Sequence, residues 1–134
     1  MNRTHLEGAA EKLTAQRGYT FYTGPEDDMG HTVRNYPAAW LAPPELHAVE
    51  GRTHGRATYD MTLHLLRPGA RISPAEQRTA LAEMEAQMIE IFAELSLDER
   101  ILAVEGLSVR PRSFSLTPHG EISQTATARI VTWF

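Results

Sequence analysis

Between positions 73 and 95 the apolar residues recur at steps of three and four, the strongest pattern in the chain. Such steps place side chains on one stripe of an α-helix. Ser73 suits the N-cap, Pro74 suits the first helical position, and Glu76 completes a capping box with Ser73. The sequence therefore predicts one long helix over residues 74–95 with a buried stripe. That stripe consists of Leu81, Met84, Met88, Ile91, Phe92 and Leu95.

Residues 56–66 alternate between apolar and polar side chains, which predicts a strand with one buried face. The apolar face should pack against the long helix. Asp60 and His64 lie four residues apart on the polar face, where they could act as a general acid–base pair. A polar row on the solvent side of an antiparallel sheet is the alternative interpretation. The apolar positions are Ala57, Tyr59, Met61, Leu63 and Leu65.

The segments before this strand are shorter and less regular. Residues 4–17 predict a first helix that ends at Gly18, and residues 19–23 predict a short strand. Residues 26–35 are polar and without a period, which indicates a loop. Prolines in residues 36–46 predict an edge strand, because proline cannot donate to a central ladder. Residues 47–55 predict a polar connection with a hairpin turn at its tip.

After the long helix, Ser96 and Glu99 form a second capping-box pattern, which predicts a short extra helical turn over residues 96–103. Residues 107–117 predict a strand kinked at Pro111. A tight turn at 118–120 then leads into a closing strand over 121–134. This last strand is apolar on both sides near its end, so it should be central in the sheet or covered on both faces.

This order of elements predicts the α+β class, since helices and strands do not alternate regularly. We expect a two-layer sandwich, in which a mostly antiparallel sheet packs on the helix of residues 74–95. The short N-terminal helix should lie on the same face. The chain has 134 residues, of which 42% are hydrophobic, and this suffices for one domain over residues 1–134.

Composition narrows the candidate functions. There are no cysteines, which excludes disulfides, thiolate zinc sites and a cysteine nucleophile. The formal net charge is −4, which disfavours binding of nucleic acid through the whole surface. Arg110 and Arg112 make a local basic pair, which we interpret as the solvated edge of a strand. No secretory signal pattern or membrane-length apolar run is present, so we expect no membrane partner.

Known catalytic motifs are missing from the sequence: it has no nucleophile elbow, zinc-binding helix, dinucleotide fingerprint or phosphate loop. Glu26, Asp27, Asp28 and His31 could form a metal cluster. However, their spacing fits no standard site, and runs of carboxylates in loops are usually solvated. We therefore expect no catalytic, cofactor-binding or metal-binding residue, no cofactor, and no enzyme activity.

Several features favour association with other copies of the chain. The proline-broken strand, the aromatic C-terminal end and the acidic loop leave much sheet edge for a small protein. Trp40 could pack in the core or lie in a subunit interface, where tryptophan is enriched. The candidate interface residues are Trp40, Leu41, Pro43, Pro44, Trp133 and Phe134.

The stretches 36–44, 59–66, 116–122 and 133–134, in this order of elements, resemble the tail-terminator and tail-completion proteins of long-tailed phages and prophages, which include head–tail joining proteins. The resemblance implies a structural protein that forms a homo-oligomeric ring, commonly hexameric, at the tail-tube end or head–tail junction. It implies other tail or head-completion proteins as partners, without direct nucleic-acid binding. The location would be cytoplasmic during assembly and in the virion if the protein is phage-encoded. Glu26, Asp27 and Asp28 would be candidates for the ring rim.

Two other classes stay open. One is a small enzyme or ligand-binding protein of the dimeric ferredoxin-like barrel kind, in which Tyr59, Asp60 and His64 would line a pocket between subunits. The other is an interaction module of the host that forms no ring. The mass of the protein in solution distinguishes these classes. A hexamer or larger ring supports the phage class, a tight dimer with a pocket supports the barrel class, and a chain that stays monomeric at high concentration excludes both.

Overall fold

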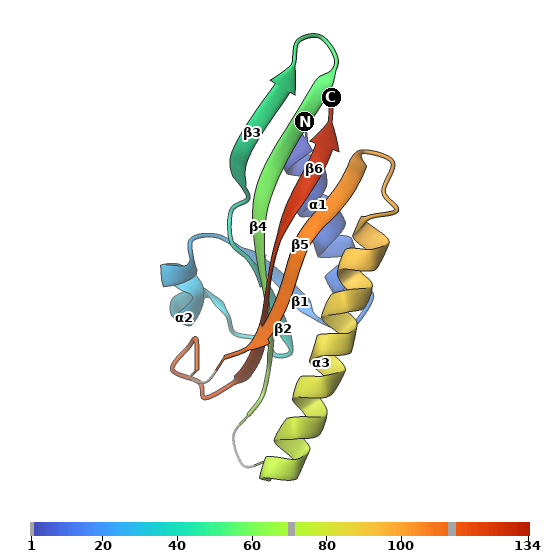
Figure 1. Ribbon diagram of the computed structural model, residues 1–134. Coiled ribbons are helices and arrows are strands. Elements are labelled where there is room, and N and C mark those ends of the chain that lie inside the picture. The colour runs from blue at the N-terminus through green and yellow to red at the C-terminus, as the bar shows by residue number, and fades with distance from the viewer. Residues whose placement is uncertain (1, 70–71, 113–114) are drawn as a thin grey trace.

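A six-stranded sheet with two helices on one face forms the frame of the chain (Figure 1). The computed structural model describes residues 2–69, 72–112 and 115–134. The predicted α+β class and two-layer arrangement are confirmed. The elements in chain order are α1 (Asn2–Ala15), β1 (Thr20–Thr23), the 3₁₀ turn η1 (Glu26–Asp28), α2 (Met29–Thr32), β2 (Ala38–Leu41), β3 (Glu45–Gly51), β4 (Gly55–Arg67), α3 (Pro74–Leu95), β5 (Ile101–Pro111) and β6 (Ile122–Trp133).

The strand order across the sheet is β1-β2-β4-β6-β5, and β3 pairs with the N-terminal half of β4. β4 and β6 form the central ladder, whose register runs from Arg56 opposite Trp133 to Arg67 opposite Ile122. The predicted central position of the last strand is therefore confirmed. β1 and β2 run parallel, whereas the other paired strands are antiparallel.

Helix α3 is the long helix that the sequence predicts, and it begins and ends at the predicted residues. The Ser73 side chain accepts a hydrogen bond from the Glu76 backbone N–H, and the Glu76 side chain accepts one from the backbone N–H of Ser73. Its stripe and the predicted apolar face of β4 are buried in the same core, although the strands nearest to α3 are β5 and β6. The buried stripe residues are Met84, Met88, Ile91, Phe92 and Leu95, with Leu81 partly buried.

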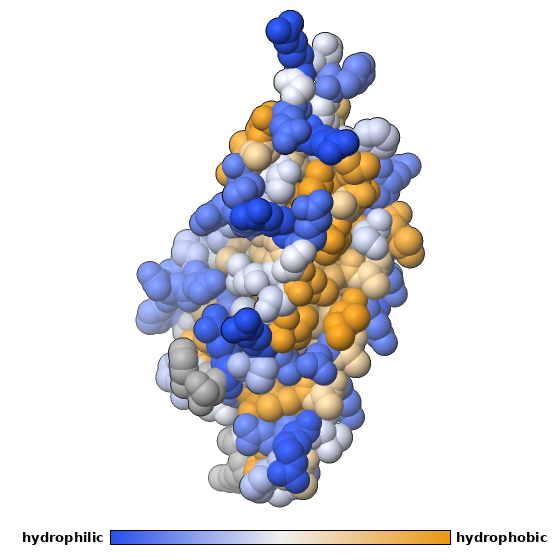
Figure 2. Space-filling model, in the orientation of Figure 1, coloured by the Kyte–Doolittle hydropathy of each residue, from blue (hydrophilic) through white to orange (hydrophobic). Residues whose placement is uncertain are grey.

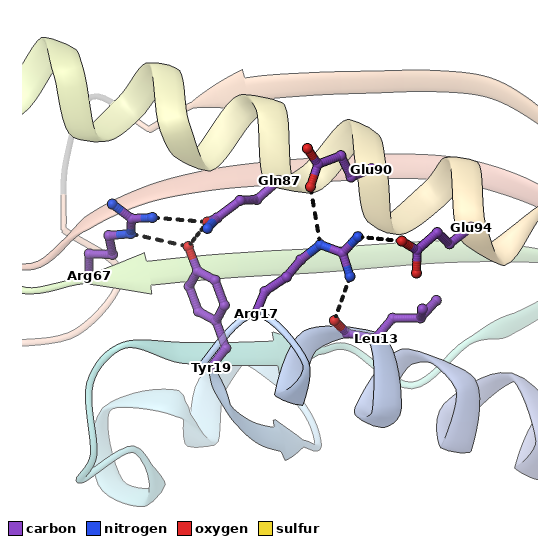
Figure 3. Close-up of polar contacts among 7 residues, drawn as sticks. All are labelled: Leu13, Arg17, Tyr19, Arg67, Gln87, Glu90 and Glu94. Carbon is purple, nitrogen blue, oxygen red and sulfur yellow. Dashed lines mark hydrogen bonds and ion pairs between the residues drawn. The ribbon is translucent and has the colours of Figure 1, made fainter.

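Polar contacts fasten the two helices and the sheet together (Figure 3). Arg17, just after α1, pairs with Glu94 of α3 at 2.8 Å and with Glu90 at 3.4 Å. Tyr19 donates its hydroxyl proton to Gln87 Oε1 at 2.6 Å and accepts a hydrogen bond from Arg67 Nε at 3.2 Å. These contacts join β4 and the segment between α1 and β1 to α3, which fixes the long helix across the sheet.

The position of β2 corrects the prediction for residues 36–46. The strand is interior, because it pairs with β1 on one side and with β4 on the other. All four of its residues are buried. Pro37, Pro43 and Pro44 lie outside these four residues, so they bound the strand and do not interrupt its hydrogen bonds. The prolines therefore indicated the ends of a short strand and not an edge.

Two segments predicted to be irregular contain regular structure. β3 occupies most of the predicted polar connection, although the hairpin turn between Gly51 and Gly55 is where the sequence placed it. Residues 26–32 form η1 and α2, and Met29 and Val33 are buried beneath them. The few apolar residues of this segment thus serve as anchors, which a search for periodicity cannot detect.

The extra helical turn predicted over residues 96–103 is wrong. Ser96 is the C-cap of α3, and β5 already begins at Ile101. Gly106 lies in an irregular part of β5 with φ of +62°, a conformation that favours glycine. The strand predicted over residues 107–117 ends at Pro111, and positions 113 and 114 lie outside the described residues.

A smaller second core covers one end of the sheet face opposite α1 and α3. It consists of Met29, Val33, Ala38, Trp40 and Leu66. The rest of this face, which we call the open face, carries polar side chains of β4, β5 and β6. Among the helices in the described part of the chain, none has both the length and the apolar character needed to cross a membrane.

Candidate functional site

An apolar surface lies at the end of the sheet where β3 and β4 meet. This hairpin projects beyond α1 and α3, so the helices do not cover its end (Figure 1). Val49 and Leu46 are opposite Ala57 and Tyr59 of β4 and share their face of the sheet. A hollow of about 600 Å³ lies among these residues and the end of β6. We call it the hairpin surface; its large apolar residues are Leu46, Val49, Trp133 and Phe134, which are 51%, 55%, 55% and 47% exposed.

The outer edge of the sheet at β5 is a second uncovered feature. β5 has 11 residues and pairs on one side with β6. Leu102 and Leu107 are exposed on this strand. Figure 2 shows apolar side chains gathered along the line of β5, with polar side chains on both sides. An edge strand presents unpaired backbone groups, which can pair with another chain.

The six residues predicted for a subunit interface separate into two groups. Trp40 is 1% exposed, and Leu41 and Pro44 are also buried, so they contribute to the core of the subunit. The Trp40 indole donates to the Gly24 carbonyl at 3.0 Å. Pro43 is exposed, and the two C-terminal aromatic residues, Trp133 and Phe134, lie on the hairpin surface. The surface available to a partner is therefore at the end of β6 and not at β2.

The three acidic residues predicted for a ring rim lie together in η1 and are exposed. Glu26 turns toward the sheet, where its Oε1 is 3.2 Å from His64 Nε2. Among the residues that the structure describes, no three metal-ligating side chains converge, and this includes the group of Glu26, Asp27, Asp28 and His31. The sequence did not indicate that Glu26 contacts His64, because 38 residues separate them.

His64 is the centre of a buried polar row on the open face. Its side chain is fully buried, with Nδ1 2.7 Å from Thr125 Oγ1. Arg112 Nε donates to the same Thr125 oxygen at 3.1 Å. Burial lowers the pKa of His64, although the hydrogen bond that His64 donates to Glu26 acts in the opposite direction. A neutral His64 then accepts from the Thr125 hydroxyl at Nδ1 and donates its Nε2 proton to Glu26, a tautomer assigned from these partners.

The pocket predicted for the barrel alternative is not assembled within one subunit. Asp60 contacts His47 at 3.3 Å and Arg129 at 3.5 Å, whereas His64 contacts Glu26 and Thr125. Tyr59 faces the opposite side of the sheet, where it belongs to the main core. Neighbouring residues of a strand point to opposite faces, so Tyr59 and Asp60 cannot line the same pocket of one subunit.

A groove of about 790 Å³ runs between α1 and the end of α3. Its floor includes Leu13 and Leu95, and His5 Nε2 lies 2.8 Å from both carboxylate oxygens of Asp98 at one side. Burial raises the pKa of Asp98, but hydrogen bonds from the Arg100 backbone and His5 outweigh it and hold the pKa below its usual range. This contact between His5 and Asp98 fastens α1 to the turn after α3.

The lowered pKa of His64 predicts a loss of stability in acid. Below about pH 6.5 the unfolded chain binds a proton at this histidine that the folded protein resists, so the free energy of unfolding should fall as the pH drops toward the lowered pKa. Glu26 and Arg112 are the charged groups facing His64. Urea unfolding between pH 5 and 8 measures this dependence. His64→Gln should flatten it, and an equally steep curve for that variant would contradict the assignment.

No protein-family model matches the chain, and no curated protein matches it. The function is therefore inferred from the architecture and from the surfaces described above.

Proposed function

We propose that this protein is a structural subunit of the phage or prophage tail-terminator type, which assembles into a homo-oligomeric ring at a tail-tube end or head–tail junction. The order of elements supports the proposal, because it keeps the N-terminal helix, the long helix and the closing β-hairpin on which the resemblance depends. No catalytic step is part of this function. Other tail or head-completion proteins would be its partners.

The observation that carries the proposal is the hairpin surface. Four large apolar side chains are each about half exposed around one hollow. Contiguous exposed apolar surface of this kind marks interaction sites in soluble proteins. Burying it against a neighbour would stabilise the assembly by about 25 cal/mol for each Å² of apolar area removed from water.

A closed ring also needs a second, different surface. In a cyclic head-to-tail assembly each subunit contacts its two neighbours through unlike patches. The hairpin surface lies on the helix side of the sheet, whereas β5 forms a sheet edge. We assign β5, with Leu102 and Leu107, to the other half of the contact, because an edge strand offers both backbone and apolar contacts to a neighbour.

Changes to the hairpin surface test this assignment. Val49→Asp and Phe134→Asp should each weaken association at least tenfold, since each places a carboxylate in apolar contact area and about 1.4 kcal/mol corresponds to a factor of ten. Native mass spectrometry and light scattering over a range of concentrations measure the effect. Ile89→Asp is the matched control, because Ile89 is 50% exposed on α3, outside the hairpin surface, and this variant should assemble normally.

The assembled state of the unaltered protein decides between the classes. A hexamer or larger ring, visible by electron microscopy, supports the proposal, as do capsid and tail genes beside the gene for this protein. A chain that stays monomeric at high concentration overturns it. A tight dimer favours the barrel alternative. If Val49→Asp and Phe134→Asp assemble as the unaltered protein does, the ring uses another surface.

A further inference from the structure

A polar hollow of about 500 Å³ lies on the open face between β5 and β6, away from the hairpin surface. Ser108, Arg110 and Arg112 alternate along β5 and its continuation, so all three are on the same face. Thr125 and Thr127 are opposite them on β6. Within 500 Å³, the hollow thus brings two guanidinium groups and three hydroxyl groups together.

Arg110 and Arg112 differ from those arginines of the protein that form ion pairs. Arg129, on the same face, contacts Asp60, and Arg17 and Arg67 contact glutamates of α3. In contrast, no carboxylate of the described residues lies within ion-pair distance of Arg110 or Arg112. Other arginines of the described residues also form no ion pair, so the feature that distinguishes Arg110 and Arg112 is that both line one hollow.

Each of these guanidinium groups is held by its Nε atom. Arg110 Nε donates to Ser108 Oγ at 3.2 Å, and Arg112 Nε donates to Thr125 Oγ1 at 3.1 Å. The terminal Nη groups have no acceptor among the described residues, so they can donate to a ligand. This is the pair of parallel donors with which arginine binds carboxylate and phosphate groups.

The position of Arg112 is set from beneath the sheet surface. Thr125 is buried, and its hydroxyl oxygen accepts from Arg112 while its proton is donated to His64. His64 in turn donates to Glu26. The row Arg112–Thr125–His64–Glu26 therefore orients one guanidinium group, and Thr125 acts as a positioning residue that does not itself contact the ligand.

From this arrangement we propose that the hollow binds a dianionic tetrahedral oxyanion, either inorganic phosphate or the phosphate group of a phosphomonoester. Arg110 and Arg112 provide two positive charges and the fork-shaped donors, and Ser108 and Thr127 add hydroxyl groups at the rim. A dianion balances both charges, whereas a carboxylate or a phosphodiester carries one charge. The proposal does not depend on ring formation.

Titration with inorganic phosphate tests the site in the unaltered full chain. In ¹H–¹⁵N spectra, the Nε signals of Arg110 and Arg112 should shift in a saturable manner, with a dissociation constant on the order of 1 mM or below. Arg110→Gln and Arg112→Gln should each weaken binding at least tenfold. Arg129→Gln is the matched control, because Arg129 is exposed on the same face and paired with Asp60, and it should bind as the unaltered protein does.

Further ligands identify the source of the phosphate group. Phosphoserine binding at least as tightly as inorganic phosphate assigns the site to phosphomonoesters, and weaker binding assigns it to free phosphate. Dimethyl phosphate and acetate, which carry one charge, should bind at least tenfold more weakly. Equal binding of either monoanion overturns the assignment to a dianion. The absence of a saturable shift at both arginines overturns the site itself.

The positioning role of Thr125 is tested separately. Thr125→Val removes the hydroxyl at nearly constant volume, so Arg112 should lose its fixed position and phosphate affinity should fall several-fold, with an altered Arg112 Nε signal in the free protein. Thr125→Ser restores the hydroxyl and should recover both. If Thr125→Val folds and binds phosphate normally, or if Thr125→Ser folds and recovers neither property, the positioning role is wrong.

Discussion

Met88→Asp should unfold the protein. Met88 is fully buried in the stripe of α3, which shares the main core with β4, β5 and β6, and no arginine or lysine side chain of the described residues is buried. An unpaired carboxylate there costs several kcal/mol or forces its own protonation, and this is comparable with the whole stability of a small domain, about 5–15 kcal/mol. Circular dichroism and thermal unfolding measure the loss.

The next residue of the same helix provides the control for this variant. Ile89 is half exposed, so Ile89→Asp should change the free energy of unfolding by no more than about 0.5–1 kcal/mol. The comparison isolates burial from helix propensity and from charge. If Met88→Asp stays folded and loses only assembly, the stripe of α3 is a subunit interface and its place in the core is wrong.

Trp40→Ala should lower the free energy of unfolding by about 3–5 kcal/mol. The Trp40 ring fills the second core, stacks on Tyr22 with centroids 6.3 Å apart, and donates its indole N–H to a backbone carbonyl. Trp133 is 55% exposed, so Trp133→Ala should cost less than about 1–2 kcal/mol. Urea unfolding at a concentration where the chain is monomeric measures both.

The two tryptophan variants should also differ in assembly. Trp133→Ala should weaken association, because Trp133 lies on the hairpin surface. Trp40→Ala should affect it only through the loss of stability. A stable Trp40→Ala protein that no longer associates would contradict the burial of Trp40 and restore its predicted place in an interface.

The elements with strong periodicity are those that the sequence predicted well. Helix α3 and strand β4 each bury one face. Their apolar residues must therefore recur with a period of 3.6 residues in the helix and of two residues in the strand. β3 carries no such signal, because both of its faces are largely exposed. β2 is only four residues long and buried on both faces, so its position in the sheet depends on partners that the local sequence does not specify.

The contacts of His64 in the polar row could not be predicted from the sequence, for a related reason. The sequence places His64 on the polar face of a strand, which by itself indicates solvent. Burial arises because the segment around Glu26 folds over this end of the open face, and Thr125 comes from a strand 61 residues later. The sequence likewise indicates that Arg110 and Arg112 form a basic pair, but only the fold shows that no carboxylate of the described residues lies within ion-pair distance of them.

The central ladder has a consequence for how the chain is made. Its pair closest in sequence, Arg67 and Ile122, already encloses α3 and all of β5. During synthesis β4 is therefore complete well before β6 leaves the ribosome, and meanwhile its apolar face and one backbone edge have no permanent partner. Such non-local pairing slows folding and leaves a strand edge open to wrong partners.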